Sequence, residues 1–320
     1  MTSDRISTVL VTGAAGGIGW RVSQMLLEKG VSVVGFDNFA FGLERPQAPG
    51  LTWENVDVGD PLLPNTLSKY PIDAIVHCAA RLAYLSMKEP AADVRTNCFG
   101  SMQIFEWAAR NNVKRVVFTS STGVYGVNPP QRPIKETDPV KADTVYSASK
   151  LACESFLELL EQGYGLSWTV LRLFATYGPT HKPSKSQGVL NAMMTQLADG
   201  NDVIVKGSAD RVRDMVYVDD TAGALVSSLL SKEAHGKIMN VGTGQGSTVR
   251  DMIYFIAEAM GKRREDINIK EVEGVPGDPF ISVADISLIQ KTIGFKPQVS
   301  LREGVARLVA ARMQPVAAAR

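Results

Sequence analysis

The chain of 320 residues has little of several features that mark special classes of protein. Its three cysteines are too few, and odd in number, for a disulfide framework. Its three histidines, His77, His181 and His235, lie far apart, so we expect no metal site. No apolar run approaches the roughly 20 residues that cross a bilayer. The net charge of +1 provides no general attraction to nucleic acid or to an anionic membrane surface.

What is present is typical of a soluble globular protein. Hydrophobic residues make up 45% of the chain and charged residues 21%. The length allows one large α/β domain with an additional lobe. Asp4 stands close to the start and an apolar strand pattern follows at Thr8, which leaves no room for a signal peptide. We therefore expect a cytoplasmic protein.

One stretch near the start combines a strand, a glycine-rich turn and a helix. The β-branched run 8–11 predicts a buried strand, and 20–29 carries apolar residues at helical spacing. The turn between them has the spacing Gly-x-x-Gly-x-x-Gly, a variant of the dinucleotide fingerprint. Gly13 allows a tight turn, Gly16 lets the backbone approach a pyrophosphate, and Gly19 lets the helix pack close to the strand. The predicted loop contacts to a dinucleotide are Gly13, Gly16, Gly17, Ile18 and Gly19.

An acidic residue after the second predicted strand, 31–36, indicates which dinucleotide binds. Asp37 lies 18 positions after Gly19. A carboxylate there accepts hydrogen bonds from the adenosine ribose and would repel the extra phosphate of NADP. We therefore predict NAD as the cofactor. The further predicted cofactor contacts are Asn38 next to Asp37, Asp57 and Val58 after the strand that begins at 51, Ala79 and Ala80 at the exit of the strand that begins at 73, Asn97 in the predicted helix 90–110, and Tyr146 and Lys150.

Strand and helix patterns alternate through the first half of the chain. This predicts a Rossmann-type doubly wound parallel sheet, with the ligand outside the carboxyl ends of its strands. We assign 1–173 to an NAD-binding domain, with 214–262 returning to it in part. An interleaved, smaller α/β substrate lobe is assigned to 174–213 and 263–320. The predicted later elements are strands 113–120, 166–173, 202–205 and 238–242, and helices 90–110, 143–161, 189–198, 217–230, 247–260, 285–293 and 301–312.

Two motifs carry candidate acid–base chemistry. Tyr146 and Lys150 are four residues apart on a predicted helix and therefore share one face. A neighbouring ammonium favours the phenolate, so we expect a lowered pKa for Tyr146. The phenol could then take a proton from a substrate hydroxyl. Ser121, in the Ser/Thr-rich turn after strand 113–120, could hydrogen-bond the same oxygen.

The order of these motifs resembles the extended short-chain dehydrogenase/reductase superfamily. Within it the chain is most similar to the NAD-dependent epimerase/dehydratase family, especially the UDP-glucose and UDP-glucuronate 4-epimerases. The resemblance implies catalysis by Ser121, Tyr146 and Lys150, and inversion of C4 of a nucleotide-sugar substrate through a 4-keto intermediate. It implies that Arg213 binds the substrate diphosphate, with Val189 as a further substrate contact. It also implies a homodimer formed through helices 90–110 and 143–161.

The chain departs from the family pattern at several positions. Members usually carry Asn where this chain has Ala175, and an assisting arginine where it has Val275. Dehydratases carry an Asp-Glu pair where it has Thr122 and Gly123, so a dehydratase is not expected. An NAD-dependent dehydrogenase or reductase of a sugar nucleotide, or of a related small polyol or hydroxy acid, remains the alternative. A non-catalytic NAD-binding scaffold is a third hypothesis.

Overall fold

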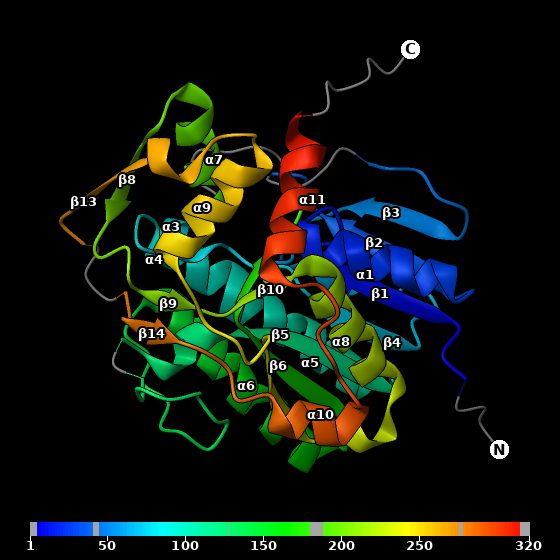
Figure 1. The fold of residues 1–320 in the computed structure, drawn as a ribbon. Helices are drawn as coiled ribbons and strands as arrows, with labels where there is room; N and C mark the ends of the chain where they lie inside the picture. The colour runs from blue at the N-terminus through cyan, green and yellow to red at the C-terminus, as the bar shows by residue number, and fades with distance from the viewer. Residues whose placement is uncertain (1–4, 41–44, 128, 180–187, 275–277, 314–320) are drawn as a thin grey trace.

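A seven-stranded sheet is the centre of the structure, which is a computed structural model that describes residues 5–40, 45–127, 129–179, 188–274 and 278–313. The strand order is β11-β6-β5-β4-β1-β2-β3, and every neighbouring pair is parallel (Figure 1). The strands are β1 (Thr8–Thr12), β2 (Ser32–Asp37), β3 (Leu51–Asn55), β4 (Ala74–His77), β5 (Arg115–Ser121), β6 (Trp168–Leu173) and β11 (Lys237–Val241). The predicted doubly wound parallel sheet is therefore confirmed.

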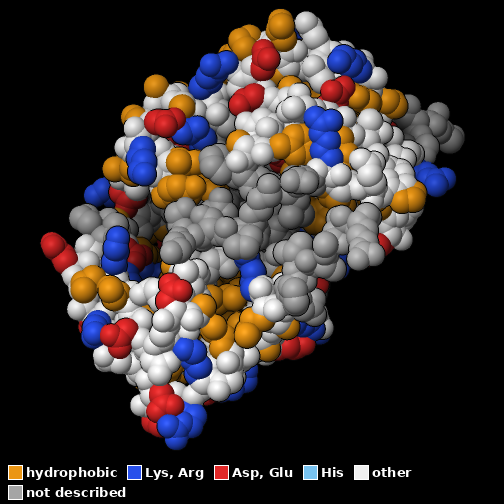
Figure 2. Space-filling model, turned by 90° about the horizontal axis from the view of Figure 1, so that it is seen from above, with side chains coloured by type: hydrophobic (Ala, Val, Ile, Leu, Met, Phe, Trp, Pro, Cys, Tyr) orange, Lys and Arg blue, Asp and Glu red, His pale blue; other side chains and the backbone are white. Residues whose placement is uncertain are grey.

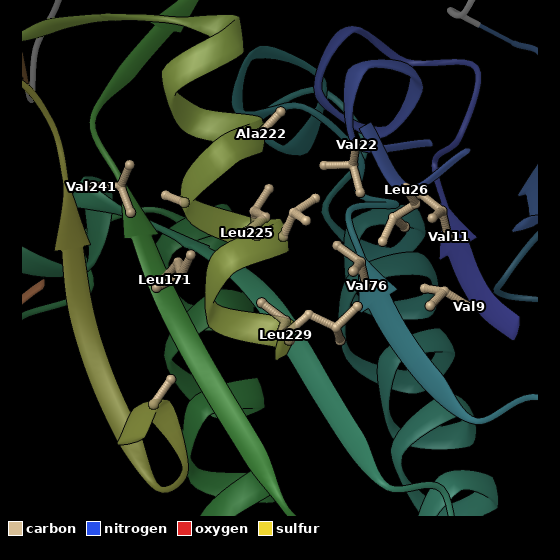
Figure 3. Close-up of a cluster of buried hydrophobic side chains, with 14 of the residues drawn as sticks. Val9, Val11, Val22, Leu26, Val76, Leu171, Ala222, Leu225, Leu229 and Val241 are labelled. Atoms are coloured by element: carbon tan, nitrogen blue, oxygen red, sulfur yellow. The ribbon is translucent and has the colours of Figure 1, made fainter. Parts of the chain in front are cut away.

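Helices cover both faces of this sheet, because side chains alternate between the faces along each strand. Val9 and Val11 of β1 pack on one face, whereas Leu10 packs on the other. Figure 3 shows Leu225 and Leu229 on the first face, opposite side chains of β1, β4 and the first helix. The first face is covered by α1 (Gly17–Glu28), α8 (Val218–Leu230) and α10 (Ser287–Ile293), and the second by α2 (Leu63–Leu67), α5 (Ser101–Arg110) and α6 (Val145–Tyr164).

A second group of elements packs around its own apolar cluster, which includes Leu197, Ile253 and Val305. Figure 1 places much of this group at the upper left, with α11 beside it. Its helices are α7 (Val189–Asp199), α9 (Val249–Ala259) and α11 (Leu301–Met313). Its short strands are β7 (Ala175–Tyr177), β8 (Asp202–Lys206), β9 (Val212–Arg213), β10 (Met215–Tyr217), β12 (Ser247–Thr248), β13 (Asn268–Val272) and β14 (Ile281–Ser282). The exact domain boundaries given above stay a prediction.

The predicted helix 90–110 differs from the structure in its middle. It consists of α4 (Pro90–Asp93), a π-helical segment η1 (Val94–Gly100) and α5. A widened π turn often occurs where a side chain has a special task. Here the segment carries the buried Asn97. The remaining short helices are α3 (Ala83–Ser86), η2 (Thr122–Tyr125), η3 (Lys232–Ala234) and η4 (Arg264–Asp266).

The predicted strand 238–242 is β11, which pairs with β6, and the predicted helix 247–260 is α9, with Thr248 as its N-cap. Within the described ranges, no helix combines the length and apolar character that crossing a membrane requires. Val275 and His181 lie outside the described residues.

A buried histidine links β1, β4 and α5. His77 Nδ1 lies 2.6 Å from Thr12 Oγ1, and Nε2 lies 2.8 Å from Ser101 Oγ. Ser101 donates to the Asn97 carbonyl, so its oxygen is free to accept from Nε2–H, which leaves Nδ1 to accept from Thr12. This chain of donors suits the neutral imidazole, and burial lowers the pKa of His77 to about 3.

We predict that His77 makes stability depend on pH. Below about pH 6.5 an unfolded chain protonates this histidine while the folded chain does not, so stability falls as pH falls, by up to about 1.4 kcal/mol per pH unit. His77→Asn, which retains a donor and an acceptor, should show a weaker fall over the same range. Urea unfolding of both proteins between about pH 7 and 5 measures the difference. Equal pH dependence in the two proteins would contradict the assignment.

Candidate active site

A cavity of about 730 Å³ lies at the carboxyl ends of β1, β2 and β4. Its size is within the range of small-molecule sites. Residues from the second group of elements, Ala175 of β7 and Met215 of β10 among them, form its other wall. Twelve of the residues predicted to bind cofactor or substrate line it: Gly13, Gly16, Gly17, Ile18, Gly19, Asp37, Asn38, Asp57, Val58, Ala79, Ala80 and Val189.

The glycine loop lies against the exit of β4 at distances that exclude side chains. Gly13 has φ +65°, and a Cβ atom there would lie 2.8 Å from the Ala79 nitrogen. A Cβ at Gly19 would lie 2.2 Å from the Gly13 oxygen. Helix α1 begins at Gly17, so its unpaired N-terminal amides and positive dipole end face the loop. The loop can therefore accept a pyrophosphate without steric obstruction.

The acidic residues of the cavity also hold its own backbone. Asp37 accepts hydrogen bonds from the Ala15 nitrogen at 3.0 Å and from the Phe39 nitrogen at 2.7 Å. Asp57 accepts from Asn38 Nδ2 at 3.0 Å. These contacts join the glycine loop to the ends of β2 and β3, and they leave the carboxylates at the cavity wall.

Asn97 does not line the cavity but holds a segment that does. Its side chain is buried, accepts from the Arg81 nitrogen at 2.7 Å and donates to the Arg81 oxygen at 3.2 Å. Arg81 is not among the predicted site residues, although its position directly after Ala79 and Ala80 indicates a place at the cofactor site. Arg81 lines the cavity, and its buried Nε has no hydrogen-bond partner among the described residues. An acceptor atom of a ligand could satisfy it.

Three consecutive residues at the end of β5 contact one face of α6, and we call this contact the β5–α6 seam. Lys150 Nζ donates to the Thr119 carbonyl at 2.9 Å, and Ser120 donates to Glu154. Ser121 hydrogen-bonds the Tyr146 side chain. The helix residues of the seam are spaced by four and therefore share a face: Tyr146, Lys150 and Glu154. The seam brings the three predicted catalytic residues together.

A buried ion pair supports the seam from behind. Glu154 Oε2 lies 2.7 Å from Arg172 Nη2, and both side chains are at most 5% exposed. Arg172 also donates to the Tyr125 hydroxyl at 3.0 Å. The role of Glu154 is not among the predictions, although its spacing of four residues after Lys150 places it on the same helix face.

The predicted low pKa of Tyr146 is wrong. Burial raises the pKa of Tyr146 to about 12, and the hydrogen bond with Ser121 only partly opposes this. The Lys150 ammonium is engaged by the Thr119 carbonyl, and burial lowers the pKa of Lys150 itself. A neighbouring ammonium favours the phenolate, but the free-energy cost of burying the phenolate is larger than this attraction.

Arg213 lies outside the cavity lining, on β9, two residues before the cavity residue Met215. Its guanidinium donates to the Val212 carbonyl and pairs with Asp278. The position suits a substrate group that extends from the cavity along β9.

The charged side chains show no bias toward one sign on the face seen in Figure 2, where basic and acidic groups are interspersed. Among the described residues, no group of histidine, cysteine and acidic side chains could hold a metal ion.

The glycine cradle, the carboxylate of Asp37 and the unsatisfied Arg81 Nε fit the phosphates and ribose of a dinucleotide. The fold and the site together define a Rossmann-type protein with a Ser/Tyr/Lys site at the cofactor end of its sheet.

Comparison with known proteins gives the family. The profile described as NAD dependent epimerase/dehydratase family matches residues 9–242. The chain belongs to this family, whose members depend on NAD.

Curated relatives and solved structures match nearly the whole chain. UDP-glucose 4-epimerase of Mycolicibacterium smegmatis is 32% identical over 310 residues, which cover 94% of this chain and 96% of that protein. A UDP-glucose 4-epimerase of Thermotoga maritima, solved with UDP-glucose, superposes with TM-score 0.89 at 30% identity, over 95% of this chain and 98% of that one. The Thermus thermophilus UDP-glucose 4-epimerase, solved with NAD, has TM-score 0.87 at 32% identity, over 96% and 100% of the two chains.

We predict that Gly19→Ala disrupts the cofactor site. The added methyl group would collide with the Gly13 carbonyl, and overpacking of this kind costs about 1–3 kcal/mol. The variant should melt at a lower temperature and lose NAD during gel filtration. Gly163→Ala, in α6 with no atom within 4 Å of the new Cβ, is the matched control and should behave like the wild type. Full NAD retention by Gly19→Ala would contradict the prediction.

Proposed function

We propose that this protein is an NAD-dependent epimerase that inverts C4 of an NDP-hexose, of the UDP-glucose/galactose or the uronate type, through a 4-keto intermediate. The observation that carries the proposal is the β5–α6 seam, which joins Ser121, Tyr146 and Lys150. None of the three lines the cavity itself, but Lys150 acts electrostatically on Cys78, which lines the cavity together with the glycine loop. Relatives named UDP-glucose 4-epimerase match nearly the whole length of the chain, and this supports the choice of substrate class.

The proposed cofactor site consists of the glycine loop with Asp37, Asn38, Asp57 and Val58 and the β4 exit with Ala79 and Ala80. Asn97 would act indirectly, by holding the Arg81 backbone. When bound there, NAD would supply the acceptor for the C4 hydrogen and a positively charged ring.

In the proposed mechanism, Tyr146 takes the proton from the C4 hydroxyl and later returns it. Its raised pKa keeps the phenol protonated at neutral pH, and the cofactor, when bound, would supply a positive charge that favours the phenolate. Ser121, hydrogen-bonded to the phenol, holds the same substrate oxygen and relays the proton. Lys150 supplies a positively charged ammonium group at the proposed catalytic site. Its hydrogen bond to the Thr119 carbonyl fixes the position of this ammonium group.

Epimerisation also requires that the sugar turn while the nucleotide stays bound. We propose that the lobe formed by 174–213 and 263–320 anchors the substrate, with Arg213 on the diphosphate and Val189 at the cavity wall. Ala175 at the cavity wall is smaller than the Asn usual in the family and leaves more room for the sugar.

We propose that the protein is a homodimer formed through α5, α6 and the preceding η1. Large apolar side chains are exposed on these elements: Val94, Phe99 and Leu159, the last with 62% of its surface accessible. Exposed apolar side chains grouped on neighbouring helices favour an interface between subunits.

The function is tested by turnover of UDP-glucose, with UDP-glucuronate as a second substrate. We expect the C4 epimer to form and reach equilibrium while NADH absorbance stays flat, because the reaction has no net redox change. NADH that accumulates in proportion to product would favour the dehydrogenase alternative instead. Absence of turnover of both substrates by protein that retains NAD would contradict the proposal.

We predict that Tyr146→Phe lowers the turnover rate by about 10²- to 10⁴-fold, the usual contribution of a proton-transfer group. NAD content and melting temperature should stay near the wild-type values, since only a hydroxyl is removed. Tyr164→Phe removes an exposed hydroxyl from the same helix and should leave turnover unchanged. A Tyr146→Phe protein as active as the wild type would exclude the phenol from catalysis.

A further inference from the structure

Two arginines on one extended segment meet the same carboxylate. Arg211 and Arg213 flank Val212, and both guanidinium groups pair with Asp278, one on each carboxylate oxygen. Residues two apart on an extended chain project to the same side. Their side chains are mostly buried, with 13% and 16% of their surfaces exposed. The two cations therefore form one anion-binding group.

Backbone carbonyls hold both guanidinium groups in place. Arg211 Nε donates to the Ser208 carbonyl at 2.9 Å, and its Nη2 donates to the Lys206 carbonyl at 2.5 Å. Arg213 Nη1 donates to the Val212 carbonyl at 2.7 Å and to the Phe280 carbonyl at 3.3 Å. A guanidinium that is already oriented binds an oxyanion at a lower cost in conformational entropy. The group is thus preorganised for an anion with two acceptor sites.

The place of this group in the fold connects it to the cavity. β9 continues through Asp214 into β10, where Met215 lines the cavity. Asp214 is itself held by the Thr243 and Gly244 nitrogens at 2.7 and 2.9 Å. The segment that carries both arginines is therefore fixed next to the cavity wall that Met215 lines.

We propose that Arg211 is a second ligand of the substrate diphosphate, beside Arg213. It takes the role of the assisting arginine that family members usually carry at the position where this chain has Val275. The inference rests on the proposed function, since it assigns a residue to the same substrate site. Two phosphate groups offer more acceptors and more charge than the single Asp278 carboxylate that now pairs with both arginines. Arg211 touches the substrate but takes no part in proton transfer.

The test compares binding of nucleoside diphosphates and monophosphates to the NAD-loaded protein by calorimetry. UDP, dTDP and GDP are titrated, and the tightest is used together with its monophosphate. We expect Arg211→Gln to weaken diphosphate binding by about 10- to 100-fold, as for loss of a charged hydrogen-bond donor, and monophosphate binding much less. Arg211→Lys should recover part of the loss. Arg250→Gln, which removes a more exposed cation paired with Asp210, is the matched control and should bind like the wild type.

The outcomes separate the inference from the proposed function. If the wild type binds a diphosphate and epimerises its sugar, but Arg211→Gln binds that diphosphate equally well, the inference alone is wrong. Equal weakening of diphosphate and monophosphate binding would mean a structural role for Arg211 and would also overturn it. If the wild type binds none of the three diphosphates, the proposed function and the inference both fail.

Discussion

The site depends on the contact between the end of β5 and one face of α6. Tyr146, Lys150 and Glu154 follow each other at four-residue intervals and meet Ser121, Thr119 and Ser120 in turn. The helix therefore cannot rotate or slide without breaking three polar contacts at once. The buried pair between Glu154 and Arg172 extends this constraint to β6. Breaking such a pair leaves an uncompensated buried charge, which costs about 3–5 kcal/mol. The positions of the proposed catalytic residues and the stability of the fold are in this way set by the same contacts.

The second constraint is the close approach of the glycine loop to the exit of β4. Gly13 and Gly19 fit only without side chains, and His77 joins β1 to β4 just below the loop. Asn97 extends the same frame to the segment at Arg81. The cofactor end of the sheet is rigid because of these contacts. The opposite wall is formed by short strands and by α7, which suits a lobe that must hold a nucleotide while its sugar turns.

Local patterns in the sequence were sufficient for much of this architecture. The parallel sheet, the glycine loop, Asp37 and the pairing of Tyr146 with Lys150 all depend on residues close in sequence or on regular spacing. The four-residue spacing after Lys150 places Glu154 on the same helix face, but its partners Ser120 and Arg172 are 34 and 18 positions away, and no local pattern identifies them. The π segment η1 carries Asn97, whose hydrogen bonds to the Arg81 backbone are tertiary contacts that helix propensity does not indicate. The raised pKa of Tyr146 could not be predicted from the sequence either, because it is caused by burial. Burial is a property of the fold and outweighs one neighbouring charge.

In the proposed epimerisation, the C4 hydrogen of a sugar nucleotide leaves its carbon and returns to the opposite face of the same carbon within one site. UDP-glucose labelled with deuterium at C4 tests this most directly, with the product examined by NMR and mass spectrometry. We expect the C4 epimer to retain its deuterium at C4 and to form more slowly than the unlabelled epimer. A product that carries hydrogen from the solvent at C4, or that has lost its deuterium to free cofactor, would contradict it.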